Sequence, residues 1–152
     1  IGILDKPYNF LTQPFAAKMV IILALLWRWT GYNMVFFLSG LQNIEYSVYE
    51  AAKIDGASAI QTFFKITVPL LKPTILLTAI MSTNGTLQLF DESINLTDGG
   101  PANASISMSH YIYNLCFKYV PNFGYAAAMS FFILLLVAVL AFIQMRVGDK
   151  RD

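Results

Sequence analysis

The sequence predicts an all-α membrane protein, on the basis of its composition and one long apolar run. Hydrophobic residues make up 57% of the chain and charged residues 12%, with a mean hydropathy of +0.58. An ordinary soluble domain carries roughly 25% charged residues. Residues 119–145 contain no charged side chain and include the run GYAAAMSFFILLLVAVLAFIQM. Because about 20 apolar residues cross a hydrocarbon core as a helix, we expect a transmembrane span over residues 122–145.

Two further spans are expected before it. Residues 16–41 are mostly apolar, although Lys18 lies near their start and Arg28 lies within them. Residues 73–90 are uncharged but contain the polar run STNGTLQ, so this helix is expected to face other helices or a cavity rather than lipid alone. The predicted fold is a helical bundle with about three spans. Since three helices can hardly enclose a pathway, we expect more chain or oligomerisation to complete it.

The basic residues predict how these spans are oriented. Arg146, Lys150 and Arg151 follow the last span, and such residues are enriched on the cytoplasmic side of membranes. This orientation places residues 43–72 in the cytoplasm and residues 91–121 outside. The lysines of the two loops agree with it, three in the first against one in the second: Lys53, Lys65 and Lys72 against Lys118.

Several classes of function are disfavoured by what the sequence contains. A net charge of +1 provides no basic surface for nucleic acid. The one cysteine, Cys116, is expected to be an inert apolar residue, and the one histidine, His110, to be a solvated or capping residue, so no metal site is predicted. No G-x-x-x-x-G-K-[ST] phosphate loop is present. We therefore expect no catalytic residues and no cofactor bound by this chain, and the protein is not predicted to be an enzyme.

The stretch EAAKIDGASAIQTFFKITVPLLKP has the pattern of two short helices joined by a glycine turn. Ser47 and Glu50 match the S-x-x-E capping box, which predicts the start of the first helix. Gly56 fits the C-terminal turn of that helix, because a left-handed backbone is readily adopted only by glycine. A second capping box, formed by Ser58 and Gln61, predicts the start of the next helix.

The second helix is expected to end at Pro69 and to carry apolar residues along one side. These residues are Ile60, Phe63 and Phe64, at helical spacing. Such an edge either lies in the membrane interface as an in-plane helix or docks in a groove of a partner protein. The residues alone leave both alternatives open.

This stretch resembles the EAA loop of ABC-importer permeases, with Val68 where the family usually has leucine. The segments FDESINLTDGGPAN and FGYAAAMS also resemble parts of the carbohydrate-uptake subgroup, which includes the larger membrane subunit of the maltose system. The resemblance runs from WTGYN to the C-terminal span. The loop positions at the family spacing are Glu50, Ala51, Ala52, Gly56, Ile66 and Pro69.

The resemblance implies the C-terminal portion of a type I permease, whose bundle has six or more spans, in a bacterial or archaeal cytoplasmic membrane. It implies four kinds of partner: a dimer of ATP-binding subunits that holds ATP and Mg, a second permease subunit, an extracytoplasmic solute-binding protein, and membrane lipid. The helix after the glycine corresponds to the coupling helix, which docks in a cleft of the ATP-binding subunit. The residues implied for this contact are Glu50, Ala51, Ala52, Asp55, Gly56, Ala57, Ile60, Phe64, Ile66 and Pro69.

Polar residues within the spans are the candidates for a substrate pathway. The resemblance implies that they contribute to a sugar site at mid-membrane: Gly31, Tyr32, Asn33, Asn84, Thr86 and Gln88. Amide and hydroxyl groups beside an aromatic ring suit a neutral polyol, but such residues also form hydrogen bonds between helices. Arg28 is expected to snorkel or to form an ion pair, or else to contact an anionic substrate.

The predicted function is therefore that of a permease subunit of a binding-protein-dependent ABC transporter importing a sugar or related polyol. Through the EAA-loop helix, ATP hydrolysis in the partner would drive alternating access. Two alternatives remain: a permease for another solute class, such as glycerol phosphate, a peptide or an amino acid, and a membrane scaffold subunit without transport activity. The run TDGGPAN is expected to form a turn, in a loop that meets the solute-binding protein in this family.

Overall fold

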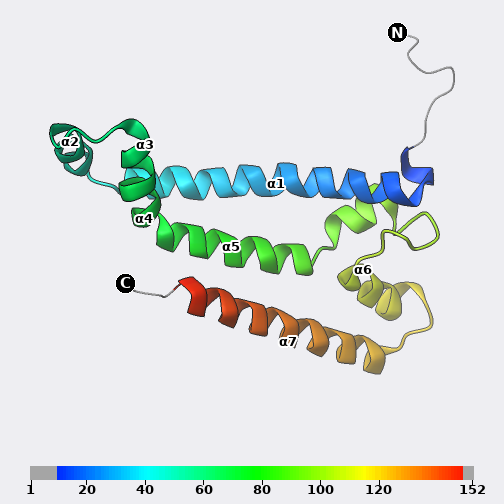
Figure 1. The fold of residues 1–152 in the computed structure, drawn as a ribbon. Helices are drawn as coiled ribbons and strands as arrows, with labels where there is room; N and C mark the ends of the chain where they lie inside the picture. The colour runs from blue at the N-terminus through cyan, green and yellow to red at the C-terminus, as the bar shows by residue number, and fades with distance from the viewer. Residues whose placement is uncertain (1–9, 149–152) are drawn as a thin grey trace, which may run out of the picture. The chain divides into compact units, whose positions relative to one another are not determined.

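The computed structural model describes residues 10–148, in which every regular element is helical and no β-strand is present. The all-α prediction is confirmed for these residues (Figure 1). Lys150 and Arg151, on which the expected orientation partly rests, lie outside the described residues.

In chain order the α-helices are α1 (Pro14–Gln42), α2 (Tyr46–Ile54), α3 (Ala59–Thr62), α4 (Val68–Leu70), α5 (Lys72–Leu87), α6 (Met108–Tyr113) and α7 (Phe123–Gly148). The short elements between them are the 3₁₀ turn η1 (Phe10–Thr12) and the π-helical turns η2 (Phe63–Thr67), η3 (Ser93–Thr97) and η4 (Asn114–Lys118).

Two helices of the described residues are long and apolar enough to cross a membrane. These are α1, with 29 residues, and α7, with 26. A third crossing results if Ala59–Leu70 and Lys72–Leu87 are counted as one span, bent by 64°. The three helices lie over the residues that the sequence predicts as spans, although α5 ends at Leu87 instead of Phe90. The side of the membrane that each loop faces stays a prediction.

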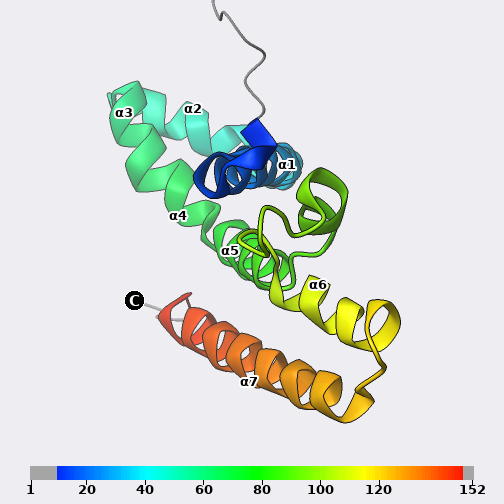
Figure 2. The same cartoon turned by 90° about the vertical axis from the view of Figure 1, so that its right-hand side faces the viewer.

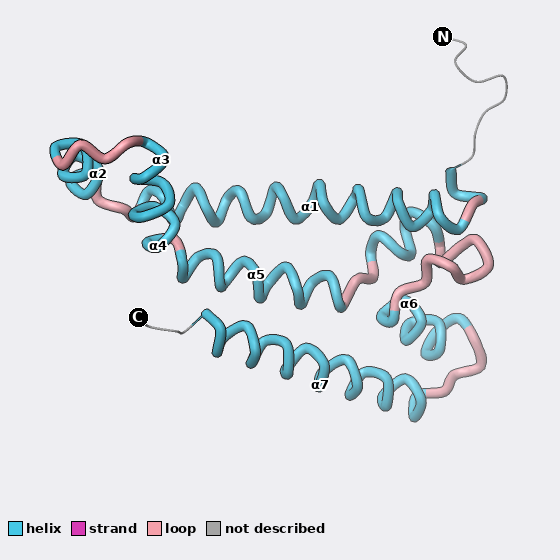
Figure 3. The backbone as a smooth tube through the Cα atoms, in the orientation of Figure 1, coloured by secondary structure: helices cyan, strands magenta, loops and turns pink. Residues whose placement is uncertain are grey.

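The described residues divide into two compact units. The first contains residues 10–28 and 84–138, and the second contains residues 29–83 and 139–148. The loop between α1 and α5 (residues 43–72, below called the helical loop) belongs to the second unit. The segment between α5 and α7 (residues 91–121, below called the connecting segment) belongs to the first. Figure 3 shows that both contain short helices joined by loops.

Close helix contacts hold the second unit together. A Cβ atom at Gly40 of α1 would lie 2.8 Å from Leu71 Cδ2 and 2.9 Å from Thr74 Oγ1, so any larger residue would force these side chains to shift. Further along α1 and α5, Ser82 Oγ donates a hydrogen bond to Asn33 Oδ1 at 3.2 Å. Small residues and polar pairs of this kind stabilise helix contacts in membrane proteins.

The first unit has a small polar core in the connecting segment. Ser93, His110, Asn114 and Leu115 are buried there. The run TDGGPAN forms a turn, as expected, with left-handed backbone at four of its positions: Asp98, Gly99, Ala102 and Asn103. The sequence predicts this segment as a loop. In the structure it is mostly helical, and its residues pack against one another.

The helical loop differs from the sequence prediction at its start. The expected capping box at Ser47 and Glu50 is wrong, because α2 begins at Tyr46 with Glu45 as its N-cap residue and has no side-chain cap. Ser47 Oγ instead donates to Glu45 Oε2 at 3.2 Å. Because the helix starts one residue before it, Ser47 lies inside the first turn of α2, and its hydroxyl is not in the N-cap position.

The second difference concerns Pro69, which was expected to end the second helix and does not. Helical backbone continues through Leu70, and the break lies at Leu71. Figure 2 shows α3, α4 and α5 following one another along the chain. Pro69 is the second residue of α4, whose first N–H, at Val68, bonds to the Phe63 carbonyl of the preceding π turn. Proline is tolerated in the first turn of a helix because no N–H is needed there.

Candidate functional site

The turn at Gly56 shapes the helical loop. Gly56 has φ +76°, and its N–H donates to the Lys53 carbonyl at 3.1 Å, while the Ala57 N–H donates to the Ala52 carbonyl at 3.0 Å. These two bonds define a Schellman motif, which reverses the chain after a helix and needs a left-handed residue at the glycine position. The sequence prediction for Gly56 is confirmed. A Cβ atom there would have nothing within 4 Å, so the requirement comes from the backbone alone.

The second helix starts at the predicted capping box. Ser58 N–H donates to Gln61 Oε1 at 2.8 Å, and Gln61 N–H donates to Ser58 Oγ at 3.3 Å. Both bonds of the box are present, so this prediction is confirmed. The Gly56 turn and the Ser58 box, only two residues apart, fix the direction in which α3 leaves α2.

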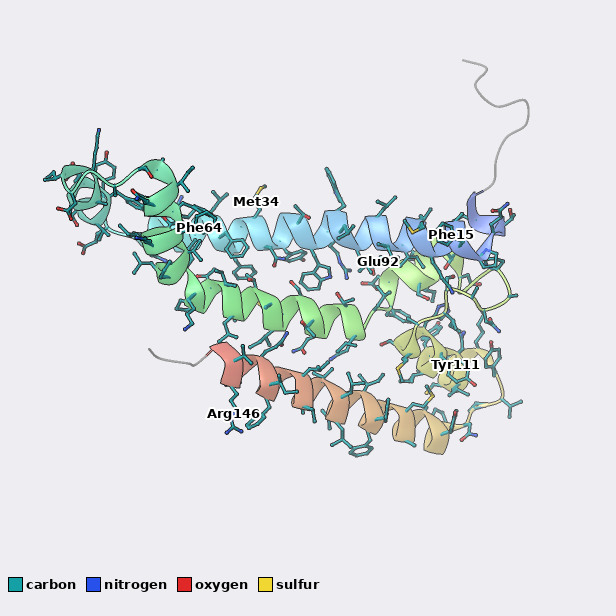
Figure 4. All side chains as sticks on the ribbon, in the orientation of Figure 1. Phe15, Met34, Phe64, Glu92, Tyr111 and Arg146 are labelled. Atoms are coloured by element: carbon teal, nitrogen blue, oxygen red, sulfur yellow. The ribbon has the colours of Figure 1, made fainter. Side chains whose placement is uncertain are left out.

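The apolar side of the second helix is uncovered. Ile60 is 72% exposed and Phe64 is 65% exposed, and Phe63 is also exposed. The Phe63 and Phe64 rings contact each other edge to face, with centroids 5.0 Å apart. Phe64 is labelled in Figure 4. Exposed apolar side chains held on a defined backbone mark a surface that meets lipid or another protein.

Contacts within the helical loop hold the helix that carries these exposed residues in place. Tyr49 Oη and Thr67 Oγ1 lie 3.3 Å apart and link α2 to η2. A cavity of about 500 Å³ lies beside this link, lined by Tyr49, Lys53, Ala57, Ala59, Thr62, Phe63 and Thr67. The remaining predicted residues of the loop differ in exposure: Glu50, Ala51, Asp55 and Pro69 are exposed, Ala57 and Ile66 are half-buried, and Ala52 is buried. The structure thus presents most of the predicted contact residues to the outside.

The predicted substrate-pathway residues fall in both units. Gly31, Tyr32 and Asn33 belong to the second unit, and Asn84, Thr86 and Gln88 belong to the first. Asn33 accepts the hydrogen bond from Ser82, which is the interhelical role that the sequence left open for it. Gln88 lines a cavity of about 350 Å³ together with Ser109, Ile112, Ser130, Ile133, Leu134 and Val137. A shared sugar site stays a prediction.

Arg28 forms an ion pair, one of the two roles expected for it. Its Nη1 lies 2.7 Å from Glu92 Oε1 and 4.0 Å from Asp91 Oδ2. The Glu92 side chain is only 10% exposed, against 34% for Arg28. Figure 4 labels Glu92 just beyond the end of α5. Sequence reasoning missed Glu92 as the partner, because nothing in the spacing of residues 28 and 92 signals their contact.

His110 is buried, so its expected role as a solvated or capping residue is wrong. Its side chain is fully buried, with Nδ1 2.9 Å from Ser93 Oγ and Nε2 3.6 Å from Asp98 Oδ1. This burial lowers the pKa of His110 below its usual 6.5, against the effect of Asp98. Ser93 is also fully buried, so it cannot act as a nucleophile on a substrate from solution. The hydrogen bond to Ser93 and the edge-to-face contact with Phe90 accommodate the buried ring.

Two exposed groups next to His110 pair with each other. Lys118 Nζ donates to Asp98 Oδ1 at 2.9 Å and to Oδ2 at 3.0 Å. The hydrogen bond and charge of Lys118 lower the pKa of Asp98, and the same hydrogen bond raises the pKa of Lys118. The pair joins the turn at Asp98 to η4.

Comparison with known proteins places this geometry among transport proteins. The family described as "Binding-protein-dependent transport system inner membrane component" matches residues 6–151. The lactose transport system permease protein of Rhizobium radiobacter is 56% identical over 99% of this chain and 51% of its own length. The trehalose/maltose transport system permease protein of Thermococcus litoralis is 37% identical over 96% of this chain and 49% of its own length.

A solved structure agrees with these sequence matches. It is the crystal structure of a bacterial ABC transporter involved in the import of the acidic polysaccharide alginate, with a TM-score of 0.79 and 25% identity. The match covers 94% of this chain and 50% of that one. The chain spans about half the length of these relatives.

Proposed function

Because this chain belongs to the family of binding-protein-dependent transport system inner membrane components, we propose that it is part of a permease that imports a sugar or related polyol. Apolar helices and family membership make it an integral inner-membrane protein. Its relatives are named as permeases for lactose and for trehalose and maltose, and none of these names describes an enzyme. The sugar assignment rests on these names and on the polar, uncharged residues expected in the pathway.

The observation that carries the mechanism is the exposed apolar surface of α3 and η2 behind a fixed turn. Ile60 and Phe64 project from a helix whose start is set by the Gly56 turn and the Ser58 box. Burying such side chains contributes about 1.5–3 kcal/mol each. The proposal is that they fill a cleft of a cytoplasmic ATP-binding subunit, with Glu50 and Asp55 beside them. ATP and Mg would be bound by that subunit.

Movement of the docked helix would be transmitted directly to the membrane spans α1 and α5. The stretch Ala59–Leu70 continues into α5 through the bend at Leu71, and Leu71 contacts α1 at Gly40. Closure of the ATP-binding dimer would therefore displace α1 and α5 together and drive the exchange between inward- and outward-open states. In this arrangement residues 43–72 face the cytoplasm and residues 91–121 face outside. A second permease subunit and a solute-binding protein complete the proposed importer.

The Arg28 ion pair favours an uncharged substrate over an anionic one. Glu92, at 2.7 Å, neutralises the guanidinium, which removes the main reason to expect a phosphate or carboxylate ligand at this position. Amide and hydroxyl side chains such as Asn84 and Thr86 remain to bind a polyol. A permease for an acidic saccharide, like the alginate importer, is the second candidate because of its structural similarity.

The experiment that tests the proposal is purification of the intact permease from its native membrane in mild detergent. We expect an ATP-binding subunit to co-purify, and its ATP hydrolysis in the reconstituted complex to rise when a neutral sugar and its binding protein are added. A panel of lactose, maltose, alginate oligosaccharide, glycerol phosphate and dipeptide compares the solute classes. Stimulation by only glycerol phosphate or the dipeptide would reject the sugar assignment, and stimulation by alginate oligosaccharide alone would favour the acidic-saccharide candidate. Absence of any ATP-binding subunit would support the scaffold alternative instead.

The turn at Gly56 gives a prediction with two matched variants. Gly56→Val is expected to weaken the association with the ATP-binding subunit by about tenfold, because a left-handed backbone costs an ordinary residue about 1–2 kcal/mol. Gly56→Asn should change it much less, since asparagine tolerates this conformation. Quantifying the co-purified subunit checks both. Equal loss in the two variants would show that any side chain at this position blocks docking, and that the backbone is not the cause.

A further inference from the structure

The connecting segment contains a buried polar cluster that the transport proposal does not use. It comprises Ser93 of η3, Ser105 after the turn and His110 of α6, and the exposed carboxylate of Asp98 lies at its edge. Ser93 and His110 have no exposed surface. Phe90 closes over the imidazole edge to face, with ring centroids 6.1 Å apart. His110 is therefore a fully buried titratable side chain outside the spans, and its environment determines which of its nitrogens carry a proton.

The hydrogen bonds of Ser93 indicate which imidazole nitrogen carries the proton. Ser93 Oγ donates its one hydrogen to the Ser105 carbonyl at 2.9 Å and accepts from the Ser107 N–H at 3.2 Å. A hydroxyl has one donor and two acceptor sites, so the bond to His110 Nδ1 at 2.9 Å requires Ser93 to accept there. The neutral ring therefore carries its proton on Nδ1, and Nε2 is a bare acceptor.

Nε2 is unsatisfied in this neutral form. It is buried without a hydrogen-bond partner among the described residues, and the nearest polar atom across from it is Asp98 Oδ1 at 3.6 Å. That distance is too long for a hydrogen bond, and both atoms are acceptors. A proton on Nε2 would reverse the situation, because an N–H facing a carboxylate forms a charge-assisted bond at about 2.7–2.9 Å.

Asp98 is already engaged by Lys118 from η4, with both carboxylate oxygens within 3.0 Å of Nζ. These are the charged groups that act on the imidazole: Asp98 favours its protonation and Lys118 opposes it. Glu92, next to Ser93, is held by Arg28. Asp98 therefore has two possible cationic partners, one on α6 and one on η4.

We propose that His110 is an acid-responsive switch in the connecting segment: a proton taken from solvent onto Nε2 draws Asp98 away from Lys118 and frees η4 from the turn. The Asn122 N–H donates to the Leu115 carbonyl of η4 at 3.0 Å, so η4 is joined to the start of α7. Loosening η4 then loosens the entry of the chain into α7. The switch adds a pH response to the outer part of the permease, beyond the transport cycle itself.

The pH range follows from burial. Because burial lowers the pKa of His110, the unfolded chain takes up the proton first as the pH falls. The neutral imidazole therefore contributes its full stability above about pH 6.5, the unperturbed value, and this contribution is lost as the pH falls through the lowered pKa. The released state of η4 is expected on the acid side of this range.

The test is hydrogen exchange of the Asn114–Lys118 amides in the intact permease in lipid nanodiscs, at about pH 7.5 and about pH 5, which bracket histidine titration. Rates are normalised to the intrinsic rate at each pH and compared with those of α7. We expect exchange in η4 to rise by about twofold to fivefold at the lower pH, the range for losing one exposed ion pair, without a matching rise in α7 beyond its first turn.

Two variants make the interpretation specific. In His110→Asn the amide nitrogen replaces Nδ1 as the donor to Ser93, so η4 should stay protected at both pH values. In Asp98→Asn, a residue type that accepts the φ of +45°, the link to Lys118 is lost and exchange should be raised at both. The proposal is overturned by a flat response in the unaltered permease, or by a pH response that persists in His110→Asn.

Discussion

A permease carrying Ile60→Asp and Phe64→Asp is expected to insert into the membrane normally and to lose its ATP-binding subunit on purification. Both side chains are largely exposed, at 72% and 65%, so their replacement should change the free energy of unfolding by no more than about 0.5 kcal/mol. Two carboxylates facing an apolar cleft would instead cost about 3 kcal/mol or more of binding free energy. A loss of that size is about 100-fold in affinity.

The measurement is the amount of ATP-binding subunit recovered with the tagged permease, together with sugar-stimulated ATP hydrolysis. A matched control carries Phe117→Asp and Val120→Asp, two apolar residues of the connecting segment that are 74% and 89% exposed. This control should retain the subunit, because the connecting segment is proposed to face outside. Retention of the subunit by the Ile60 and Phe64 variant would show that these residues rest on lipid, which was the other possibility for this helix.

Loss of the Arg28 side chain is the second change with a large expected effect. Arg28→Met leaves the buried Glu92 carboxylate without its cation. Breaking a fully buried pair costs about 3–5 kcal/mol. Since about a third of the Arg28 side chain is exposed, we expect about 2 kcal/mol of destabilisation. The measurement is the temperature at which the purified permease loses its monodisperse peak in size-exclusion chromatography.

The double variant Arg28→Met, Glu92→Met separates charge from packing. When both partners are replaced by apolar groups of similar size, the penalty for an unpaired buried charge disappears, and stability is expected to return close to that of the unaltered protein. If the double variant is as unstable as Arg28→Met, the methylene packing of Arg28 matters and the ion pair does not. Uptake measured on the stable double variant would then show whether the charges also serve transport.

The sequence predicts best where the cause of a structure lies within a few residues. The apolar run of α7 is readable because length and hydropathy alone determine a possible span. The Gly56 turn and the Ser58 box are readable because each consists of bonds between neighbours along the chain. The failure at Ser47 has an equally local cause, since α2 begins one residue earlier, at Tyr46, and places Ser47 inside the helix.

Features that depend on residues far apart in the sequence could not be predicted from the sequence. Arg28 pairs with Glu92, which lies 64 positions later in the sequence. The burial of His110 depends on Ser93 and Phe90. The π-helical turns are a further obstacle: each of the three in the described residues shifts the helical register, so a pattern with a period of 3.6 residues no longer tells which side a residue faces. Pro69 was misjudged for a different reason, because the sequence does not show that a new helix, α4, starts just before it.

The close approach at Gly40 limits how the helical loop can move. Because a Cβ atom at Gly40 would lie within 3.0 Å of the Leu71 and Thr74 side chains, the end of α1 packs closely against the bend before α5. A displacement of α3 would therefore be passed to both α1 and α5, since Leu71 lies at the bend before α5 and beside Gly40 of α1. In the proposed importer, the helical loop and the adjoining ends of α1 and α5 would move as one part, and the flexibility of the transport cycle would come from other segments.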